Sequence, residues 1–540
     1  MRIGPHHLRA LPTMLLAATL AGPGASLCRA QAVGSLSEPV FQGQLERTAS
    51  RPITARLSAM GGAYIAVDDI NNLINLWRLD RNPAALIEDV QGNRLEIQGF
   101  RVRPTSSRGP GDSDAGRADN GFSTERVGQA IGQARWRNRF AAQAEVGYLA
   151  HDNTEDVSLG ARREGEGNGP RLAMTLNNRI GRFYWGLSLS ATNIDESTQF
   201  LYDTTYYNSV AVDRMVNNPA LITDRVSYHS IQELLGLQYE LFNGLRLGGT
   251  FALEQQRIDA ASSNQRMQLD ALNNRSLIKG SLGGTYRYRD KVIVAARYTH
   301  NSYDATETFR FSRRKKSAVQ DPPVIYDGRV ADHVYRTFSF DSRGTWRVHP
   351  KRLQLGFAYS TGKNELYKNV AVGPGSYNFL DSLYLASTPA GDSVGVSAAA
   401  LVSDASRVEK YVRWGVGAQV HPSPVSTVTA DYIRYTADLQ VNGMGRSPET
   451  REIRVGGEYV FSGKLAVRAG YLMLKLDEDR NGTIDKRDGH QVTFGLGYTR
   501  DGKKSLELVY LTGNSKSDFA DPSHLEIREQ GLQLYGRMSF

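Results

Sequence analysis

Hydrophobic and polar residues alternate along most of the chain. In residues 245–253, for example, Leu247 and Phe251 share one face, and Arg246 and Thr250 share the other. A period of two is typical of a β-strand with one apolar and one polar face. Segments of this kind, each about 10 to 14 residues long, recur towards the C-terminus and predict an all-β protein with about 14–18 antiparallel strands.

Short turns and long polar loops alternate strictly between these segments. The short turns fall at 137–138, 178–181, 242–244, 289–291, 348–351, 421–424, 462–463 and 500–503. The long loops fall near 104–121, 151–168, 193–226, 258–274, 303–332, 363–407, 440–449, 477–488 and 514–529. Short turns at one end and long loops at the other are typical of a transmembrane β-barrel. A soluble sandwich has no reason to place all its long loops at one end.

Charged residues within the segments lie on the face opposite the aliphatic residues, which predicts a polar lumen and an exterior in lipid. The basic residues of this inner face are Arg246, Arg287, Arg297, Arg413, Arg454 and Arg468, and the acidic ones are Glu254, Glu452, Glu458 and Glu507. Two interpretations stay open. Rings of charge can select what passes through a pore, or opposite charges can pair, brace the wall and hold a segment inside it.

The last eleven residues form one more alternating segment, with Leu532, Leu534, Met538 and Phe540 on its apolar face. This ending resembles the carboxy-terminal signal strand of bacterial outer-membrane β-barrels. The resemblance implies a bacterial outer-membrane location and two partners, the lipid bilayer and the outer-membrane assembly machinery. Aromatic residues close to the short turns, such as Trp136, are expected to form a girdle at the headgroup level.

The amino terminus predicts an export signal over residues 1–32. Arg2 and Arg9 contribute to a basic start, residues 11–21 are apolar, and Ala30-Gln31-Ala32 is a small-x-small cleavage site. The single cysteine, Cys28, leaves with this signal, so the mature chain is expected to lack thiol and disulfide chemistry. The formal charge of +9 over 540 residues is mild and includes no basic cluster with interleaved aromatics, which argues against nucleic acid as a partner.

Residues 54–86 do not alternate and are rich in small side chains. They contain AMGGAYIAVDD and, further on, NPAAL, with Gly61, Gly62, Asp68, Asp69, Asn82 and Pro83 at the characteristic positions. These two stretches resemble the amino-terminal hatch of the FadL-like and the related PorV-type outer-membrane barrels. Two departures are a longer spacer at 72–81 and Ala85 in place of the usual Gly.

The resemblance implies a lead-in and hatch over 33–92, inside a barrel formed by 93–540. For a FadL-like barrel it implies transport of a hydrophobic, fatty-acid-like molecule past the hatch. For a PorV-type barrel it implies service to protein secretion or surface attachment, with a secreted protein as partner. A general porin needs no such hatch and is disfavoured. Gly61 and Gly62 would let the hatch backbone move, and Asn82-Pro83 would fix its return towards the first strand.

One loop has the residue spacing of a calcium site. Asp477, Asp479, Asn481, Thr483, Asp485 and Asp488 match the oxygen-ligand positions of an EF-hand-like loop, with Gly482 at the sharp turn. The alternative is a solvated acidic loop without metal. We expect no other cofactor, and no enzymatic activity, because no Ser, His and acid can be grouped into a catalytic set.

Overall fold

The structure is a computed structural model, and it describes residues 56, 59–60, 62–63, 65–66, 82–86 and most of 92–539. Gaps in the last range fall at 109–119, 137–138, 158–160, 203–219, 243, 264–266, 290, 314–323, 350–351, 371–404, 481–482, 501–502 and 519–523. The predicted signal peptide lies outside the described residues, as do Gly61, Asp68, Asp69, Asn481 and Phe540.

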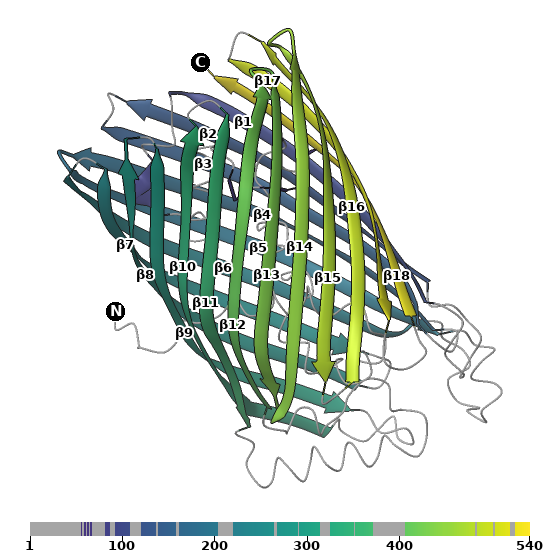
Figure 1. The fold of residues 1–540 in the computed structure, drawn as a ribbon. Coiled ribbons are helices and arrows are strands. Elements are labelled where there is room, and N and C mark those ends of the chain that lie inside the picture. Colours follow the sequence, from purple (N-terminus) through teal and green to yellow (C-terminus); the bar gives the residue numbers. More distant parts are fainter. Residues whose placement is uncertain are drawn as a thin grey trace.

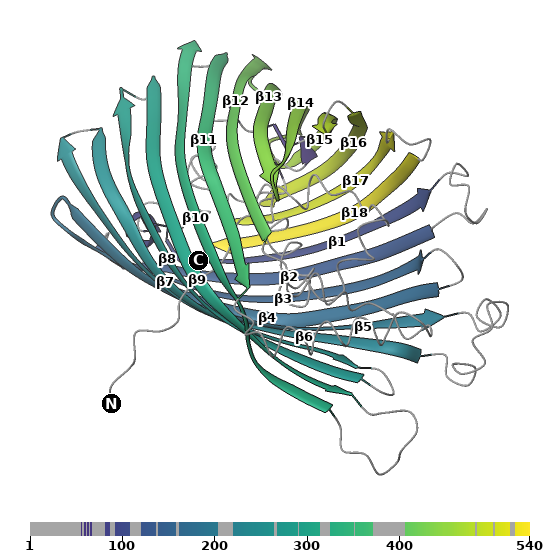
Figure 2. The ribbon, with the colours of Figure 1, turned by 90° about the horizontal axis from the view of Figure 1, so that it is seen from below.

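The chain forms one closed ring of 18 strands, each antiparallel to its neighbours (Figures 1 and 2). The strands are β1 (Arg94–Arg108), β2 (Asn120–Trp136), β3 (Phe140–Val157), β4 (Ala161–Ile180), β5 (Phe183–Tyr202), β6 (Ala220–Phe242), β7 (Leu245–Ser263), β8 (Met267–Tyr288), β9 (Val292–Arg313), β10 (Val324–His349), β11 (Leu353–Val370), β12 (Ala405–Ser423), β13 (Ser426–Val441), β14 (Met444–Phe461), β15 (Leu465–Arg480), β16 (Thr483–Arg500), β17 (Lys504–Asp518) and β18 (His524–Ser539). In the described part of the N-terminal segment, the 3-10 turn η3 (Pro83–Ala85) precedes them. No helix among the described residues is long and apolar enough to cross a bilayer.

The carboxy-terminal strand closes the ring, as the sequence predicts. β18 pairs with β17 on one side and with β1 on the other, in an unbroken register from Arg94 opposite Ser539 to Arg108 opposite Leu525. Leu532, Leu534 and Met538 are exposed on its outer face. With all edges paired, the backbone has no open hydrogen-bonding groups along a strand edge, which is what a sheet in lipid requires.

All eight predicted short turns connect strands, and they lie at the end of the barrel that also holds the end of β18 (Figure 1). We call this the short-turn end and the other the long-strand end. The number of strands agrees with the upper limit of the prediction. Their length does not, because the strands run for 15 to 26 residues.

Much of what the sequence predicts as long loops is therefore paired strand. β10, for example, covers 324–332, and the predicted loop at 440–449 is a two-residue turn at Asn442-Gly443, both with positive φ. The reason is physical. Beyond the membrane both faces of a strand are in water, so pairing continues while the apolar alternation that reveals strands in the sequence fades.

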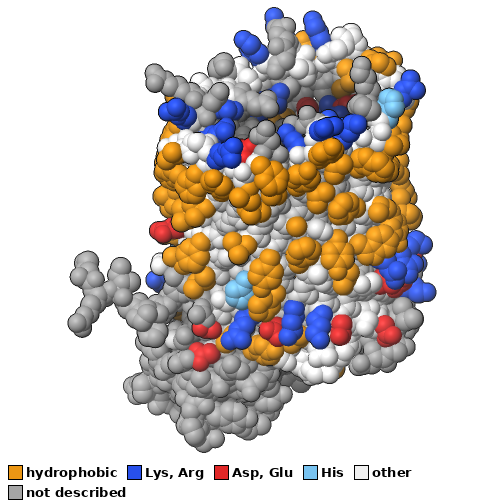
Figure 3. Space-filling model, turned by 60° about the vertical axis from the view of Figure 1, so that its left-hand side comes forward, with side chains coloured by type: hydrophobic (Ala, Val, Ile, Leu, Met, Phe, Trp, Pro, Cys, Tyr) orange, Lys and Arg blue, Asp and Glu red, His pale blue; other side chains and the backbone are white. Residues whose placement is uncertain are grey.

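Large apolar side chains cover the outside of the barrel in a broad belt (Figure 3). Leu282 is 71% exposed and Leu247 is 48% exposed. Exposure of so many neighbouring apolar side chains is favourable only where the surroundings are themselves apolar. Aromatic residues of the predicted girdle, including Trp136, Tyr288, Trp346 and Tyr498, are exposed beside the short turns. The protein is an outer-membrane β-barrel whose belt faces lipid.

Candidate functional site

The described residues of the N-terminal segment lie inside the barrel and dock at two places on its inner wall. We call residues 56, 59–60, 62–63 and 65–66 the first anchor, and residues 82–86 the second anchor. Ala59, Met60 and Ile65 of the first anchor have no exposed surface. The first anchor contacts strands from β10 to β17, and the second contacts β4 to β6. In a ring of 18 strands these are nearly opposite walls.

Charged side chains of the wall hold the backbone of the first anchor. Ile65 is held on both sides, since its N–H donates to the Asp431 carboxylate at 2.9 Å and its carbonyl accepts from the Arg343 guanidinium at 3.0 Å. Arg454 donates to the Gly62 carbonyl at 2.9 Å. Hydrogen bonds with one charged partner are about twice as strong as neutral ones. The wall therefore binds the backbone of this segment strongly, and these contacts do not depend on which side chains the segment carries.

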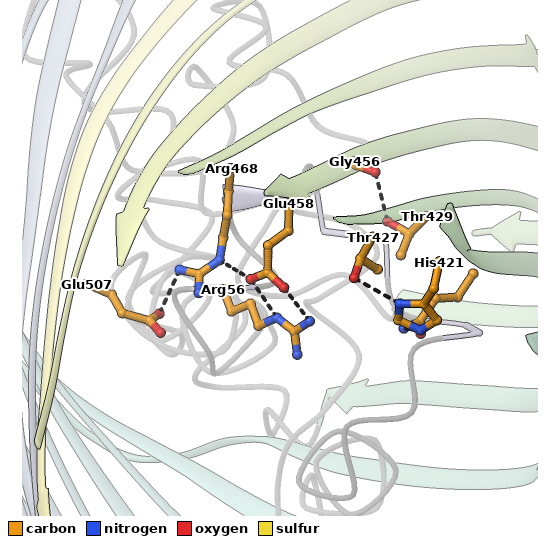
Figure 4. Close-up of polar contacts among 9 residues, drawn as sticks. Arg56, His421, Thr427, Thr429, Gly456, Glu458, Arg468 and Glu507 are labelled. Carbon is orange, nitrogen blue, oxygen red and sulfur yellow. Dashed lines mark hydrogen bonds and ion pairs between the residues drawn. The ribbon is translucent and has the colours of Figure 1, made fainter. Parts of the chain in front are cut away.

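An ion-pair network fixes the start of the first anchor (Figure 4). Arg56 donates twice to the Glu458 carboxylate, at 3.0 and 2.7 Å. Arg468 donates to the same carboxylate at 2.6 Å and lies 3.6 Å from Glu507. Glu458 and Arg468 are both buried, so each depends on the other for compensation of its charge.

The inward charges thus brace the wall and hold the N-terminal segment, which is one of the two interpretations left open by the sequence. Glu452 pairs with Arg454 and lies 3.8 Å from Arg413. Glu254 pairs with Lys279 at 3.0 Å and accepts from Ser230 and Gln256.

Glycines on the inner face let the first anchor approach the wall. A Cβ atom built on Gly356 would overlap the Ile65 carbonyl, and one built on Gly456 would overlap that of Met60. At Gly495 it would overlap the Ala59 side chain. Glycine inside a strand weakens the strand, and a close backbone approach is a recognised reason for its presence. These glycines leave a shallow depression in the inner wall, and the first anchor occupies it.

Neutral groups hold the second anchor. The Asn177 amide on β4 donates to the Ala84 carbonyl at 2.8 Å. The Asn82 side chain accepts from the Ala84 N–H at 2.9 Å and caps η3, with Pro83 at its first position. Gly186 and Gly236, which lie opposite each other on β5 and β6, leave room for Asn82 and Pro83.

The structure places some of the predicted hatch residues and adds others. Gly62 has φ of 73°, a conformation that favours glycine, and Asn82 caps the 3-10 turn that begins at Pro83. The role of these residues in a gate stays a prediction. The sequence did not reveal Arg343, Asp431 or Asn177 as contacts. A signal was present, however, in the inward glycines interrupting strands such as β11 and β14.

The calcium-like residues lie on a β-hairpin. Asp477 and Asp479 belong to β15, which ends at Arg480, and Asp488 belongs to β16, where it lies 3.9 Å from Lys475. The side chains of Thr483 and Asp485 are outside the described residues. Within the described part of the chain no three His, Cys, Asp or Glu residues are grouped as a metal site requires. Calcium binding stays a prediction.

Between the first anchor and the long-strand end, the inner wall carries a row of apolar side chains. Leu277, Tyr303, Tyr335 and Leu366 occupy matched positions on β8, β9, β10 and β11. They pack into one buried cluster with Ala305. The adjoining row towards the short-turn end is polar and consists of Lys279, Asn301, Thr337 and Asn364. A second apolar cluster, of Ile194, Tyr228 and Ile258, lies on β5 to β7.

No family model matches this sequence, and no curated protein is significantly similar to it. Among solved structures, the chain is similar to the Pseudomonas putida toluene transporter TodX, with 14% identity and a TM-score of 0.37 over 91% of this chain and 99% of that one. It is also similar to a Pseudomonas aeruginosa FadL homologue (11% identity, TM-score 0.35, 90% and 98% covered) and to P. aeruginosa OccK7 (11%, 0.41, 83% and 99%). At these scores the assignment of the fold rests on this chain's own strand pairing and lipid-facing belt.

Proposed function

We propose that this barrel carries apolar small molecules across the outer membrane, with the N-terminal segment as its gate. The observation that supports this most directly is the position of that segment, which is docked on two nearly opposite walls of the lumen. A general diffusion pore works with an open, polar lumen. Here at least one anchor has to move before a solute passes.

The inner apolar rows support an apolar solute. The side chains of Leu277, Tyr303 and Tyr335 are at most 4% exposed, although they lie on the face that a water-filled pore would line with polar groups. An apolar solute that packs against these side chains keeps their surface out of water, which contributes about 25 cal/mol per Å² of buried apolar area. A polar solute would lose that contribution. The adjoining polar row would then meet whatever polar group the solute carries.

The two anchors differ in a way that supports one order of events. The second anchor is held by neutral amide hydrogen bonds and the first by charge-assisted ones, so we expect the second to release while the first stays bound. The 3-10 turn η3 would move away from Gly186 and Gly236, against which it packs. Gly62 and the other residues of the first anchor would remain as the hinge.

Uptake of an apolar fluorophore by proteoliposomes tests this proposal. Full-length protein is expected to give saturable uptake, and a variant lacking residues 54–86 is expected to lose saturation and to leak small polar dyes. Equal uptake of apolar and polar dyes by the intact protein would contradict the proposal. Copurification with secreted proteins, without apolar uptake, would instead favour a barrel that serves secretion.

A further inference from the structure

The turns at the short-turn end carry a strong excess of positive charge. The eight connections contain nine basic residues, Arg137, Arg139, Arg182, Arg289, Lys291, Lys351, Arg352, Lys464 and Lys503. They contain only two acidic residues, Asp290 and Asp501. Figure 3 shows many Lys and Arg side chains around the upper rim, with a few acidic side chains among them, and both signs of charge below the belt.

The described basic residues of this rim do not pair with described acidic side chains. Arg139, Arg182, Arg289, Lys291, Arg352, Lys464, Lys503 and the adjoining Lys504 are all exposed. The polar contact of Arg182 is a donation to the Leu241 carbonyl at 3.2 Å, and Arg289 lies over the Tyr288 ring at 5.3 Å. Both contacts leave the positive charge uncompensated.

The long-strand end is built differently. Several of its exposed basic residues pair with acids of the same or the next strand, as in Arg126 with Asp152 at 2.7 Å and Arg257 with Asp259 at 2.8 Å. Lys363 likewise pairs with Glu365. Among the described residues, no basic residue of the short-turn connections has such a partner.

Aromatic residues fix the depth of the basic rim. Trp136, Tyr288, Trp346 and Phe461 are exposed to lipid within five residues of a basic residue of the turns. Tryptophan and tyrosine at a barrel's edge mark the level of the lipid headgroups. The basic side chains therefore begin where the phosphate groups of the adjacent leaflet lie, and arginine and lysine bind phosphate well.

From this geometry we infer that the short-turn rim binds the anionic headgroups of glycerophospholipids in the leaflet around it. The charge complementarity and the continuity with the aromatic girdle favour lipid over a soluble partner. Each basic side chain near an anionic surface contributes roughly a fivefold preference for an anionic over a zwitterionic headgroup. The rim would hold the barrel at a defined depth and collect anionic lipid around it.

Quenching of tryptophan fluorescence by brominated phospholipids measures this preference, because Trp136 and Trp346 lie on the rim. The full-length protein, with Trp414→Phe to remove a lipid-facing tryptophan away from the rim, is reconstituted with brominated phosphatidylglycerol or phosphatidylcholine. At low salt we expect phosphatidylglycerol to be favoured about fivefold. The preference should fall towards one in 0.5 M NaCl, since salt screens exposed charges.

Two matched variants decide the assignment. Changing Arg289, Lys291, Lys464 and Lys503 to Gln should abolish most of the preference. Changing Arg126, Arg257, Lys363 and Lys475 to Gln at the long-strand end should leave it intact. A preference that survives the first variant, or is absent from the parent protein, would overturn the inference. So would a loss in sodium phosphate that exceeds the loss in NaCl of equal ionic strength, because that result would indicate a site for free phosphate.

Discussion

The two anchors of the N-terminal segment bind nearly opposite walls of the lumen by different chemistry. The first uses Arg343, Asp431 and Arg454 on its backbone and Glu458 on Arg56. The second uses the amide of Asn177 and the close fit of η3 over two glycines. Charge-assisted hydrogen bonds are stronger and are lost with a larger penalty when buried. The difference suggests a segment tethered at one side of the lumen and releasable at the other.

The largest effect is expected from Glu458→Gln. This change leaves Arg56 and Arg468 without their shared carboxylate. It weakens the binding of the first anchor to the wall by about 3 kcal/mol, which is at the lower end of the range for breaking one side of a buried ion pair. Trypsin should then cleave after Arg56 in the assembled barrel, whereas the parent protein is expected to resist this cleavage. Glu449→Gln, at an exposed pair with Arg434 and Arg451, is the control and should leave cleavage unchanged.

An intermediate effect is expected from Gly236→Ala, which places a methyl group against Asn82 and Pro83. The second anchor should be displaced at about 1 to 3 kcal/mol, the usual range for overpacking. Leakage of a small polar dye from proteoliposomes should rise, while trypsin resistance at Arg56 is kept. Gly128→Ala, where an added Cβ has no neighbour within 4 Å, is the control. Cleavage at Arg56 in the Gly236 variant would mean that the anchors are not independent.

The smallest effect is expected from Asn177→Ala, which removes the neutral hydrogen bond to the Ala84 carbonyl and a second one, within the wall, to the Trp185 carbonyl. Such a bond contributes about 1 kcal/mol, so the fraction of time spent open should rise about fivefold. Single-channel recording measures this fraction directly. An Asn177 effect larger than that of Asp431→Asn, which weakens the grip on Ile65, would reverse the ranking of the two anchors.

The sequence predicts the ring of strands well and the contacts of the N-terminal segment with the inner wall poorly. Seven of the eight short turns are predictable because glycine, asparagine or proline interrupts an apolar alternation that lipid enforces, and the eighth, at 289–291, because three charged residues interrupt it. The Arg–Glu pairing of the lumen is also predictable, since both signs alternate on one face. Strand length is not, because β10 continues into water, where neither face has to be apolar. Contacts such as Arg343 with Ile65 join residues 278 positions apart and leave no local pattern.

The central claim is that the second anchor moves during transport while the first stays in place. Two engineered disulfides test it, in a chain whose only cysteine, Cys28, lies in the predicted export signal. Ala84→Cys with Asn177→Cys locks the second anchor, and Ala59→Cys with Thr493→Cys locks the first, since the wall side chain of each pair contacts the anchor residue and no glycine is replaced. Apolar-fluorophore uptake should stop when the second pair is oxidised and return on reduction, and it should be unaffected by the first pair. Normal uptake with the second anchor locked, or a block caused only by locking the first, would contradict the account.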